Sequence, residues 1–173
     1  MKKYFILKQD AYLENVVELQ GFNTSKKMVL LKENEKEFKE SSSVYINSNE
    51  NTIYPDLIQA PVLMVSDKLY KLFNNYENTI IYKLAVLTDM ERCIQKVYRL
   101  MLTDIIDALS DKSTYLKNGW IDKIVLDTNK IGDYNIFQIK AGVSIYLIVS
   151  LDVAEAMLKR GFVGINFIEV EAV

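Results

Sequence analysis

Two stretches of the chain share one pattern of hydrophobic and polar positions. The first begins with a continuous apolar run at residues 62–65, which is typical of a strand buried on both faces. Ser66 follows as a candidate helix cap, and Asp67 complements the positive end of the helix dipole. Apolar residues then recur at i, i+3, i+4 and i+7, namely Leu69, Leu72, Phe73 and Tyr76. Residues 79–87 resume a strand, so the pattern predicts a strand-helix-strand unit over about residues 61–87.

The same pattern returns near the C-terminus, over about residues 145–170. An apolar run at residues 145–149 ends at Ser150, a second candidate helix cap that stands 84 positions after the first. Gly161 is placed where a left-handed residue often follows a helix, and residues 163–170 are expected to form the closing strand. Because both strand-to-helix junctions read Val-Ser, the sequence predicts an internal duplication.

The middle of the chain allows two interpretations. Over residues 94–109 the apolar positions would stripe one face of a helix, whereas residues 97–102 also fit a strand with alternating faces. Beyond them, residues 121–126 predict a strand, residues 127–133 a turn, and residues 134–139 the partner strand of a hairpin.

The N-terminal third carries weaker signals. The expected elements are a strand at residues 3–8, an apolar stretch at 15–22, a turn at 21–25, an exposed helix at 32–40 and a short strand at 44–46. Glu35 and Lys39 stand four residues apart, so an ion pair between them would support the exposed helix. We therefore expect residues 1–53 to form a peripheral part of the same domain as the two units.

Length and composition indicate one globular domain. The chain has 173 residues, of which half are hydrophobic and a quarter charged, and it contains only 6 Gly and 2 Pro. Such a composition argues against disordered and low-complexity proteins. We expect a single α+β domain over residues 1–173, with a mixed sheet, few helices, and the duplicated region within residues 54–173.

Charge and cysteine usage narrow the cellular setting. The net charge is -2 and the Lys and Arg residues are scattered among acidic ones, so nucleic acid is not an expected partner. The single Cys93 favours a reducing compartment. The apolar run after Met1 is too short for a signal peptide, and no window holds the roughly 18 apolar residues of a membrane span. The prediction is a cytoplasmic protein that does not cross a membrane.

Few residues offer catalytic chemistry. The chain has no histidine, so Ser-His-Asp and Cys-His machinery cannot be assembled. Cys93 is expected to be a small buried hydrophobe, without the neighbours that a reactive thiol or a zinc site needs. The segment at residues 127–138 lacks the final Glu of a calcium loop, and the glycines match no phosphate-binding motif. We therefore expect no catalytic residue, no cofactor and no metal site, and a protein that is not an enzyme.

Three carboxylates are the remaining candidates for a site. Asp104, Asp107 and Asp111 are spaced i, i+3 and i+7 and would share one face of a helix. Such a face could serve paired-carboxylate catalysis, a divalent ion, or contact with a basic partner. Exposed aspartates on an ordinary solvated surface are the simpler interpretation.

The order of several short motifs between Tyr54 and Val170 carries a family resemblance. The motifs are Tyr54-Pro55-Asp56, residues 60–66 (APVLMVS), residues 106–113 (IDALSDKS), Ile136-Phe137, Ile148-Val149-Ser150 and residues 161–167 (GFVGINF). In this order and spacing, the chain resembles a family of predicted bacterial immunity proteins from polymorphic-toxin loci. The resemblance covers about residues 54–170, and it favours the strand interpretation at residues 98–102.

The resemblance implies that the protein binds and neutralises a cognate toxin by stoichiometric protein-protein interaction, with no turnover. A protein without evident catalytic groups and with a slight acidic excess is compatible with occluding a positively charged active site. The alternative is a small-ligand-binding module or a carboxylate-based enzyme that uses Asp104, Asp107 and Asp111.

Overall fold

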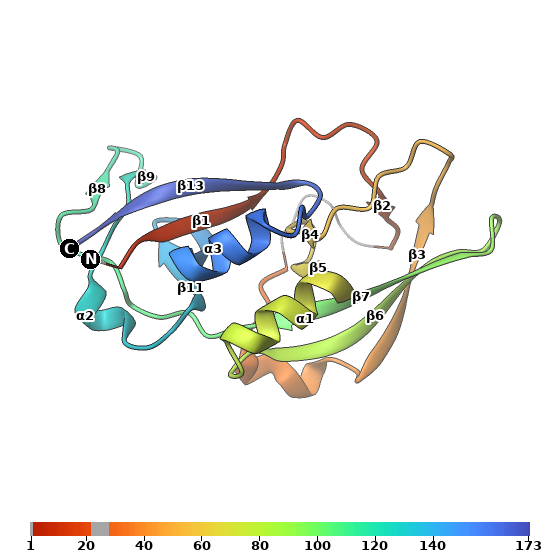
Figure 1. The fold of residues 1–173 in the computed structure, drawn as a ribbon, viewed down its shortest axis with the longest axis horizontal. Helices are drawn as coiled ribbons and strands as arrows, with labels where there is room; N and C mark the ends of the chain where they lie inside the picture. The colour runs from red at the N-terminus through yellow and green to blue at the C-terminus, as the bar shows by residue number, and fades with distance from the viewer. Residues whose placement is uncertain (1, 22–27) are drawn as a thin grey trace.

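The computed structural model describes residues 2–21 and 28–173, which form two larger sheets and a small one (Figure 1). In spatial order, the first sheet holds β10 (Val125–Leu126), β13 (Ile165–Ala172), β1 (Tyr4–Gln9), β12 (Ser144–Ser150) and β11 (Ile136–Ala141). The second holds β2 (Glu18–Leu19), β3 (Ser41–Asn47), β6 (Ile81–Asp89), β7 (Ile94–Leu102), β5 (Met64–Ser66) and β4 (Leu57–Ile58). The third pairs β8 (Thr114–Tyr115) with β9 (Ile121–Lys123).

The helices are few and short, as expected for the α+β class. They are α1 (Asp67–Tyr76), α2 (Thr128–Ile131), α3 (Leu151–Leu158) and the 3-10 helix η1 (Lys32–Glu37). The predicted strand-helix-strand units are confirmed as β5-α1-β6 and β12-α3-β13, and each unit belongs to its own sheet.

Both units have the same strand arrangement. β5 and β6 each pair antiparallel with β7, which therefore lies between them. β12 and β13 each pair antiparallel with β1 in the same way, and Figure 1 shows the N-terminal strand β1 beside the C-terminal strand β13. The N-terminal strand thus takes, in the first sheet, the place that β7 takes in the second.

The correspondence extends to the flanking strands. β4 pairs antiparallel with β5, and β11 pairs antiparallel with β12. On the other side, β3 runs parallel to β6, and β10 runs parallel to β13. Even the residues opposite the two serines agree, because Tyr98 faces Ser66 and Tyr4 faces Ser150. The two halves therefore share one topology.

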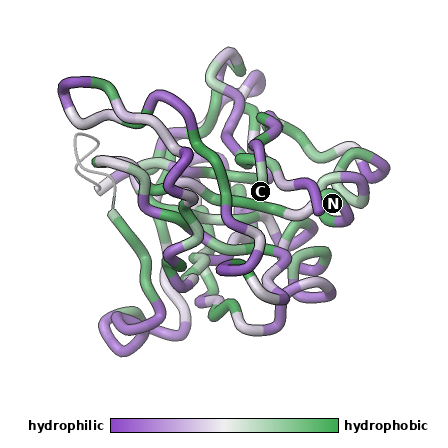
Figure 2. Tube along the Cα trace, turned by 90° about the vertical axis from the view of Figure 1, so that its left-hand side faces the viewer, coloured by the Kyte–Doolittle hydropathy of each residue, from purple (hydrophilic) through white to green (hydrophobic). Residues whose placement is uncertain are grey.

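The main hydrophobic core joins the two units. It contains residues of both sheets and of both α1 and α3, among them Leu7, Leu69, Phe73, Val149 and Val153. Full burial of one such aliphatic or aromatic side chain stabilises the fold by about 1.5–3 kcal/mol. Figure 2 shows the apolar stretches gathered towards the centre of the molecule and the polar ones in the outer loops.

The position of β1 corrects the expectation that residues 1–53 are peripheral. Tyr4 and Leu7 are almost completely buried in the centre of the first sheet. β3 is also integral, because Ser41–Tyr45 pairs with Leu84–Thr88 of β6. The local apolar pattern of these strands was visible in the sequence, but their distant partners were not.

In the middle of the chain, the strand interpretation is correct and the helix over residues 94–109 is wrong. β7 pairs with β5 on one side and β6 on the other, so sheet pairing overrides the helical periodicity. The hairpin predicted between residues 121–126 and 134–139 is also wrong. β11 pairs instead with β12, the next strand along the chain. The predicted turn at 127–133 contains the short helix α2, whose first turn Asp127 caps by accepting from the Asn129 N–H.

The N-terminal elements differ in extent from the predictions. Residues 32–40 form only the six-residue 3-10 helix η1, and Glu35 pairs with the buried Lys83 of β6 at 2.8 Å. The apolar stretch at 15–22 contributes the two-residue strand β2. The turn predicted at 21–25 falls mostly on residues 22–27, which lie outside the described part of the chain.

Candidate functional site

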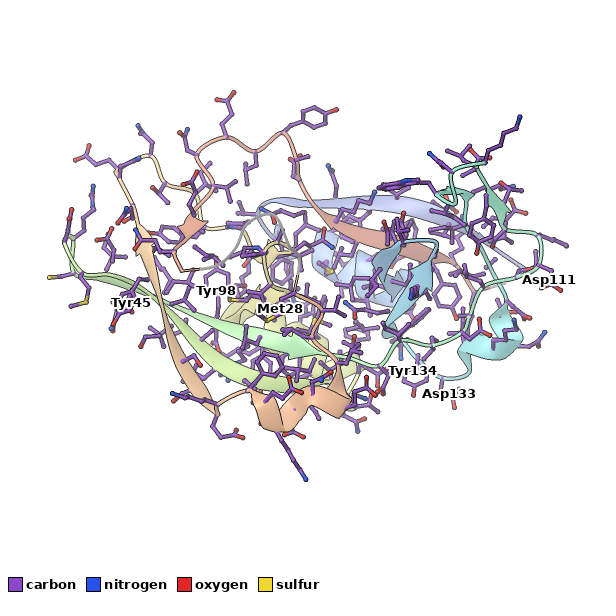
Figure 3. All side chains as sticks on the ribbon, turned by 180° about the vertical axis from the view of Figure 1, so that it is seen from behind. Met28, Tyr45, Tyr98, Asp111, Asp133 and Tyr134 are labelled. Atoms are coloured by element: carbon purple, nitrogen blue, oxygen red, sulfur yellow. The ribbon has the colours of Figure 1, made fainter. Side chains whose placement is uncertain are left out.

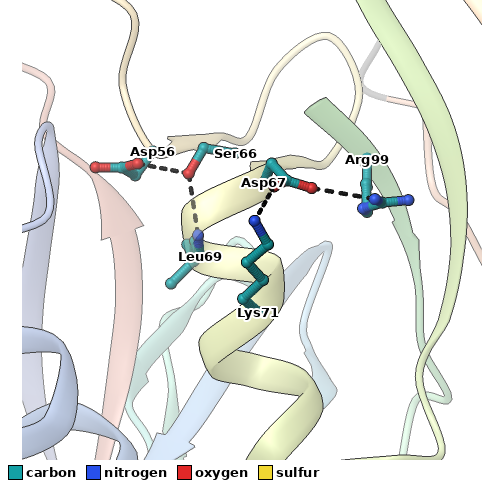
Figure 4. A network of polar contacts seen from close by, with 6 residues as sticks. All are labelled: Asp56, Ser66, Asp67, Leu69, Lys71 and Arg99. Carbon is teal, nitrogen blue, oxygen red and sulfur yellow. Dashed lines mark hydrogen bonds and ion pairs between the residues drawn. The ribbon is translucent and has the colours of Figure 1, made fainter. Parts of the chain in front are cut away.

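Asp56 joins the two units at the start of α1. Its buried carboxylate accepts hydrogen bonds from the Ser66 hydroxyl and, at 2.7 Å, from the Val163 N–H in the loop after α3. Ser66 in turn accepts from the Leu69 N–H at 3.1 Å, which confirms its predicted role as a helix cap (Figure 4). The first unit is thereby tied directly to the second.

Figure 4 also shows the ion pairs that secure the first turn of α1. Asp67 binds Lys71 at 2.7 Å and Arg99 of β7 at 3.1 Å. These two cations, with Lys71 the stronger influence, hold the pKa of the Asp67 carboxyl below its usual value. The guanidinium of Arg99 also lies 4.0 Å from the ring centre of Tyr70, which is cation-π geometry. The helix start is therefore fixed to its own sheet.

Asn135 occupies the equivalent place in the second unit. The side-chain oxygen of Asn135 accepts from the Ser150 hydroxyl at 3.1 Å. The backbone oxygen of Asn135 accepts from the Ser150 N–H at 2.8 Å. Its own N–H and amide group donate to Glu77 and to the Tyr76 carbonyl at the end of α1. Asp56 and Asn135, which directly precede β4 and β11, thus each bond to the end of the opposite unit's helix or to the loop after it.

The predicted cap at Ser150 is only partly correct. Its backbone has the extended conformation of a residue before a helix, but its hydroxyl makes no capping bond to α3. The hydroxyl binds Asn135 instead. Gly161, predicted as a left-handed residue after α3, has a φ of 58°, which confirms that assignment.

Three of the six short motifs on which the resemblance rests therefore meet in space. Tyr54-Pro55-Asp56, Ser66 and the loop at residues 161–164 form one seam between the units. Gly164 has a φ of 73°, and a Cβ atom there would lie 2.7 Å from the Pro55 Cβ. The Tyr98 hydroxyl adds a 2.7 Å bond to the Pro55 carbonyl. These residues hold the fold together, so a binding surface must be sought elsewhere.

The structure does not bring the three candidate aspartates onto one helical face. Asp104, Asp107 and Asp111 lie after β7 on an extended segment that bridges to Gln138 at Ile105 and to Leu126 at Leu109. Asp104 forms an ion pair with Lys32, whereas Asp107 and Asp111 are exposed. Figure 3 shows Asp111 at the margin of the molecule, away from Tyr45. Among the described residues, no group of three or more potential ligands is suited to a metal ion.

Cys93 was expected to be buried, and this expectation is wrong. The thiol is exposed in the turn between β6 and β7, where the residue has a φ of 55°. Asp89 organises this turn by accepting from the backbone N–H groups of Glu91 and Arg92, at 3.1 and 3.0 Å, and from Ser48. Cysteine is buried in most proteins, but the position of Cys93 in a turn exposes it here.

Sequence reasoning missed two adjoining clefts on the outer face of the first sheet, the face turned away from α3. Their volumes are about 530 and 490 Å³, and both are floored by Ile6, Lys8 and Tyr146. We call residues 119–124 the strap, because this segment runs over the outer face. At one end the Gly119 carbonyl oxygen lies where a Cβ atom on Gly142, in the turn between β11 and β12, would come within 2.6 Å of it. At the other end Lys123 forms an ion pair with Glu171 of β13.

The rims of the clefts expose large apolar side chains. Trp120, Val143 and Val29 border the larger cleft, and Ile168 borders the smaller one. The exposed fraction of these four residues lies between 42% and 68%. Lys8 lies 5.7 Å from the Tyr146 ring centre, and the ion pair of Lys123 with Glu171 adds a charged border. Exposed aromatic side chains are enriched at protein interfaces. Alternation within β13 signals Ile168 alone, because the other three residues lie outside the strands, and the floor also requires β1.

Comparison with known proteins adds no assignment, since no protein-family model matches the chain and no curated protein matches it. Within the part of the chain that the structure describes, every helix is too short or too polar to cross a membrane.

Proposed function

We propose that this protein is an immunity protein that binds a cognate bacterial polymorphic toxin in the cytoplasm and neutralises it stoichiometrically. The observation that carries the proposal is the ordered resemblance between Tyr54 and Val170. The two clefts beside the strap supply a surface of suitable character, with exposed Trp120 and Ile168 among charged residues. Neutralisation by binding needs such a surface and consumes no substrate.

Co-expression tests this function directly. The toxin gene that neighbours the gene for this protein should be tolerated by a bacterial host only when this protein is also produced. The purified pair should then elute as one complex in size-exclusion chromatography. Killing of the host despite abundant folded protein would contradict the proposal.

A matched pair of variants tests the surface. Trp120 and Tyr45 are exposed to nearly the same extent, 51% and 53%, but Tyr45 lies on β3 of the other sheet. We expect Trp120→Ala to weaken the complex at least tenfold, because aromatic anchors dominate protein interfaces. Tyr45→Ala should leave the dissociation constant within about threefold of the wild type. Equal effects of the two changes would place the contact elsewhere.

A further inference from the structure

The outer edge of β13 is largely without a partner strand. β10 pairs with Glu171 and Ala172 alone, and no other described strand pairs with this edge of β13. Asn166, Ile168 and Glu169 are exposed, whereas Val170 is buried. Figure 1 shows β13 at the border of its sheet. An edge of this kind presents a row of unused backbone donors and acceptors.

The direction of these backbone groups follows from two hydrogen bonds. Gly164 accepts from the Asp10 N–H on the β1 side, and Val173 donates to Leu126 on the β10 side. Because successive peptide groups of a strand alternate sides, those of Ile165, Phe167 and Glu169 point away from β1. They form an open row about 13 Å long over five residues, close to the length of a short natural strand.

The other half of the molecule shows what belongs in this position. There β3 runs parallel to β6 and pairs with Leu84–Thr88. Tyr98 faces both Ser66 and Ala85, and Tyr4 faces both Ser150 and Val170, so Leu84–Thr88 correspond to residues 169–173, of which β10 pairs with Glu171 and Ala172. The chain before β10 leaves the sheet as the strap, and the smaller cleft lies between the strap and residues 168–171. In the first sheet the corresponding strand, β10, therefore stops short of Glu169, whose counterpart Leu84 donates to the Glu40 carbonyl next to β3.

We propose that an extended segment of the cognate toxin adds to this sheet as a strand, parallel to β13 and bonded to the backbone of Ile165, Phe167 and Glu169. This inference rests on the proposed function and deepens it by naming the binding mode. An extended backbone is the chemistry that satisfies such a row. Alternate side chains of the added strand would enter the cleft lined by Ile121, Ile124 and Ile168, so the toxin segment should carry apolar residues at every second position.

Residue-resolved amide hydrogen exchange tests this binding mode. The probe is the unlabelled toxin domain encoded beside this protein, added to the isotope-labelled full chain. In the free protein, the amides of Ile165, Phe167 and Glu169 should exchange fast, while those of Asn166 and Ile168 should exchange slowly because they bond to β1. In the complex, the three fast amides should slow by at least 100-fold.

A proline substitution gives a second, independent readout. Glu169→Pro removes an outward N–H at an edge position that tolerates proline, and Glu169→Ala removes the same side chain but keeps the N–H. The proline variant should bind the toxin domain at least tenfold more weakly than the alanine variant. Far-ultraviolet circular dichroism verifies that both variants are folded. If the proline variant is unfolded, the hydrogen-exchange pattern of the wild-type complex tests the binding mode on its own.

The outcomes separate this inference from the proposed function. If wild-type protein and toxin domain form no complex, the proposed function is wrong and the binding mode falls with it. If a complex forms without the alternating protection, the binding mode is wrong and the function stands. If the three amides are already protected in the free protein in a concentration-dependent way, a second copy of this chain occupies the edge, which overturns the inference.

Discussion

Replacement of Asp56 by alanine should strongly destabilise the fold, because one carboxylate holds two parts of the chain together. The change removes the acceptor of both the Ser66 hydroxyl and the Val163 N–H, and Ser66 is the residue that caps α1. Each hydrogen bond to a charged acceptor is worth about 1.5–3 kcal/mol. We therefore expect Asp56→Ala to lower the free energy of unfolding by about 3–5 kcal/mol, since part of the lost bonding is recovered by water.

Two further variants sharpen this prediction. Asp56→Asn keeps one oxygen for Ser66, in the way that Asn135 serves Ser150, but its amide group would face the Val163 N–H. Its cost should be about 2 kcal/mol. Asp107 is an exposed aspartate, so Asp107→Ala should stay within about 0.5 kcal/mol of the wild type and serves as the control.

Urea unfolding at pH 7, followed by far-ultraviolet circular dichroism, measures these differences by linear extrapolation. The slopes of the unfolding curves must agree for the comparison to hold. If Asp56→Ala fell within about 1 kcal/mol of Asp107→Ala, the seam would not couple the two units energetically, and our reasoning would be refuted.

Two other predictions follow from single positions. Gly164→Ala should lower the free energy of unfolding by about 2 kcal/mol more than Gly21→Ala in the same assay. Both glycines have left-handed backbones, but only Gly164 has Pro55 and Leu13 within 3 Å of the new Cβ. Equal costs would contradict the packing argument. Hydrogen bonds from Ser48 and from the backbone of Arg92 and Glu91 hold the pKa of Asp89 below its ordinary value. Its ionised form therefore stabilises the fold above the unfolded-state pKa of about 3.9, and this stability is lost as the pH falls through the lower folded-state value. The difference in urea midpoint between wild type and Asp89→Asn should be constant from about pH 5 to 8 and shrink below about pH 4; a difference that grows on acidification would contradict this assignment.

Local patterns predicted the two helical units well. The run at residues 62–65, the cap at Ser66 and the apolar spacing after it depend on neighbours within a few residues, and the structure confirms them. Gly161 belongs to the same group, because a left-handed residue after a helix is a local requirement.

Predictions that needed distant partners were less reliable. Nothing local to β1 indicates that its neighbours are β12 and β13, and the pairing of β11 with β12 competes with an equally plausible hairpin. The hydroxyl of Ser150 prefers Asn135, which an isolated helix start cannot reveal. The clefts were missed for the same reason, since their floor combines Ile6 of β1 with Tyr146 of β12.

The shared topology of the halves also has a consequence for the order of folding. β6 and β7 are joined by a tight turn and can pair early. β1 must find strands that follow it by roughly 140–170 residues, at an extra loop-closure cost of about 3 kcal/mol. During synthesis, β2 to β7 can complete their sheet while β12 and β13 are still absent. The N-terminal strand must wait for the last part of the chain, so the first sheet should close late in the folding of this protein.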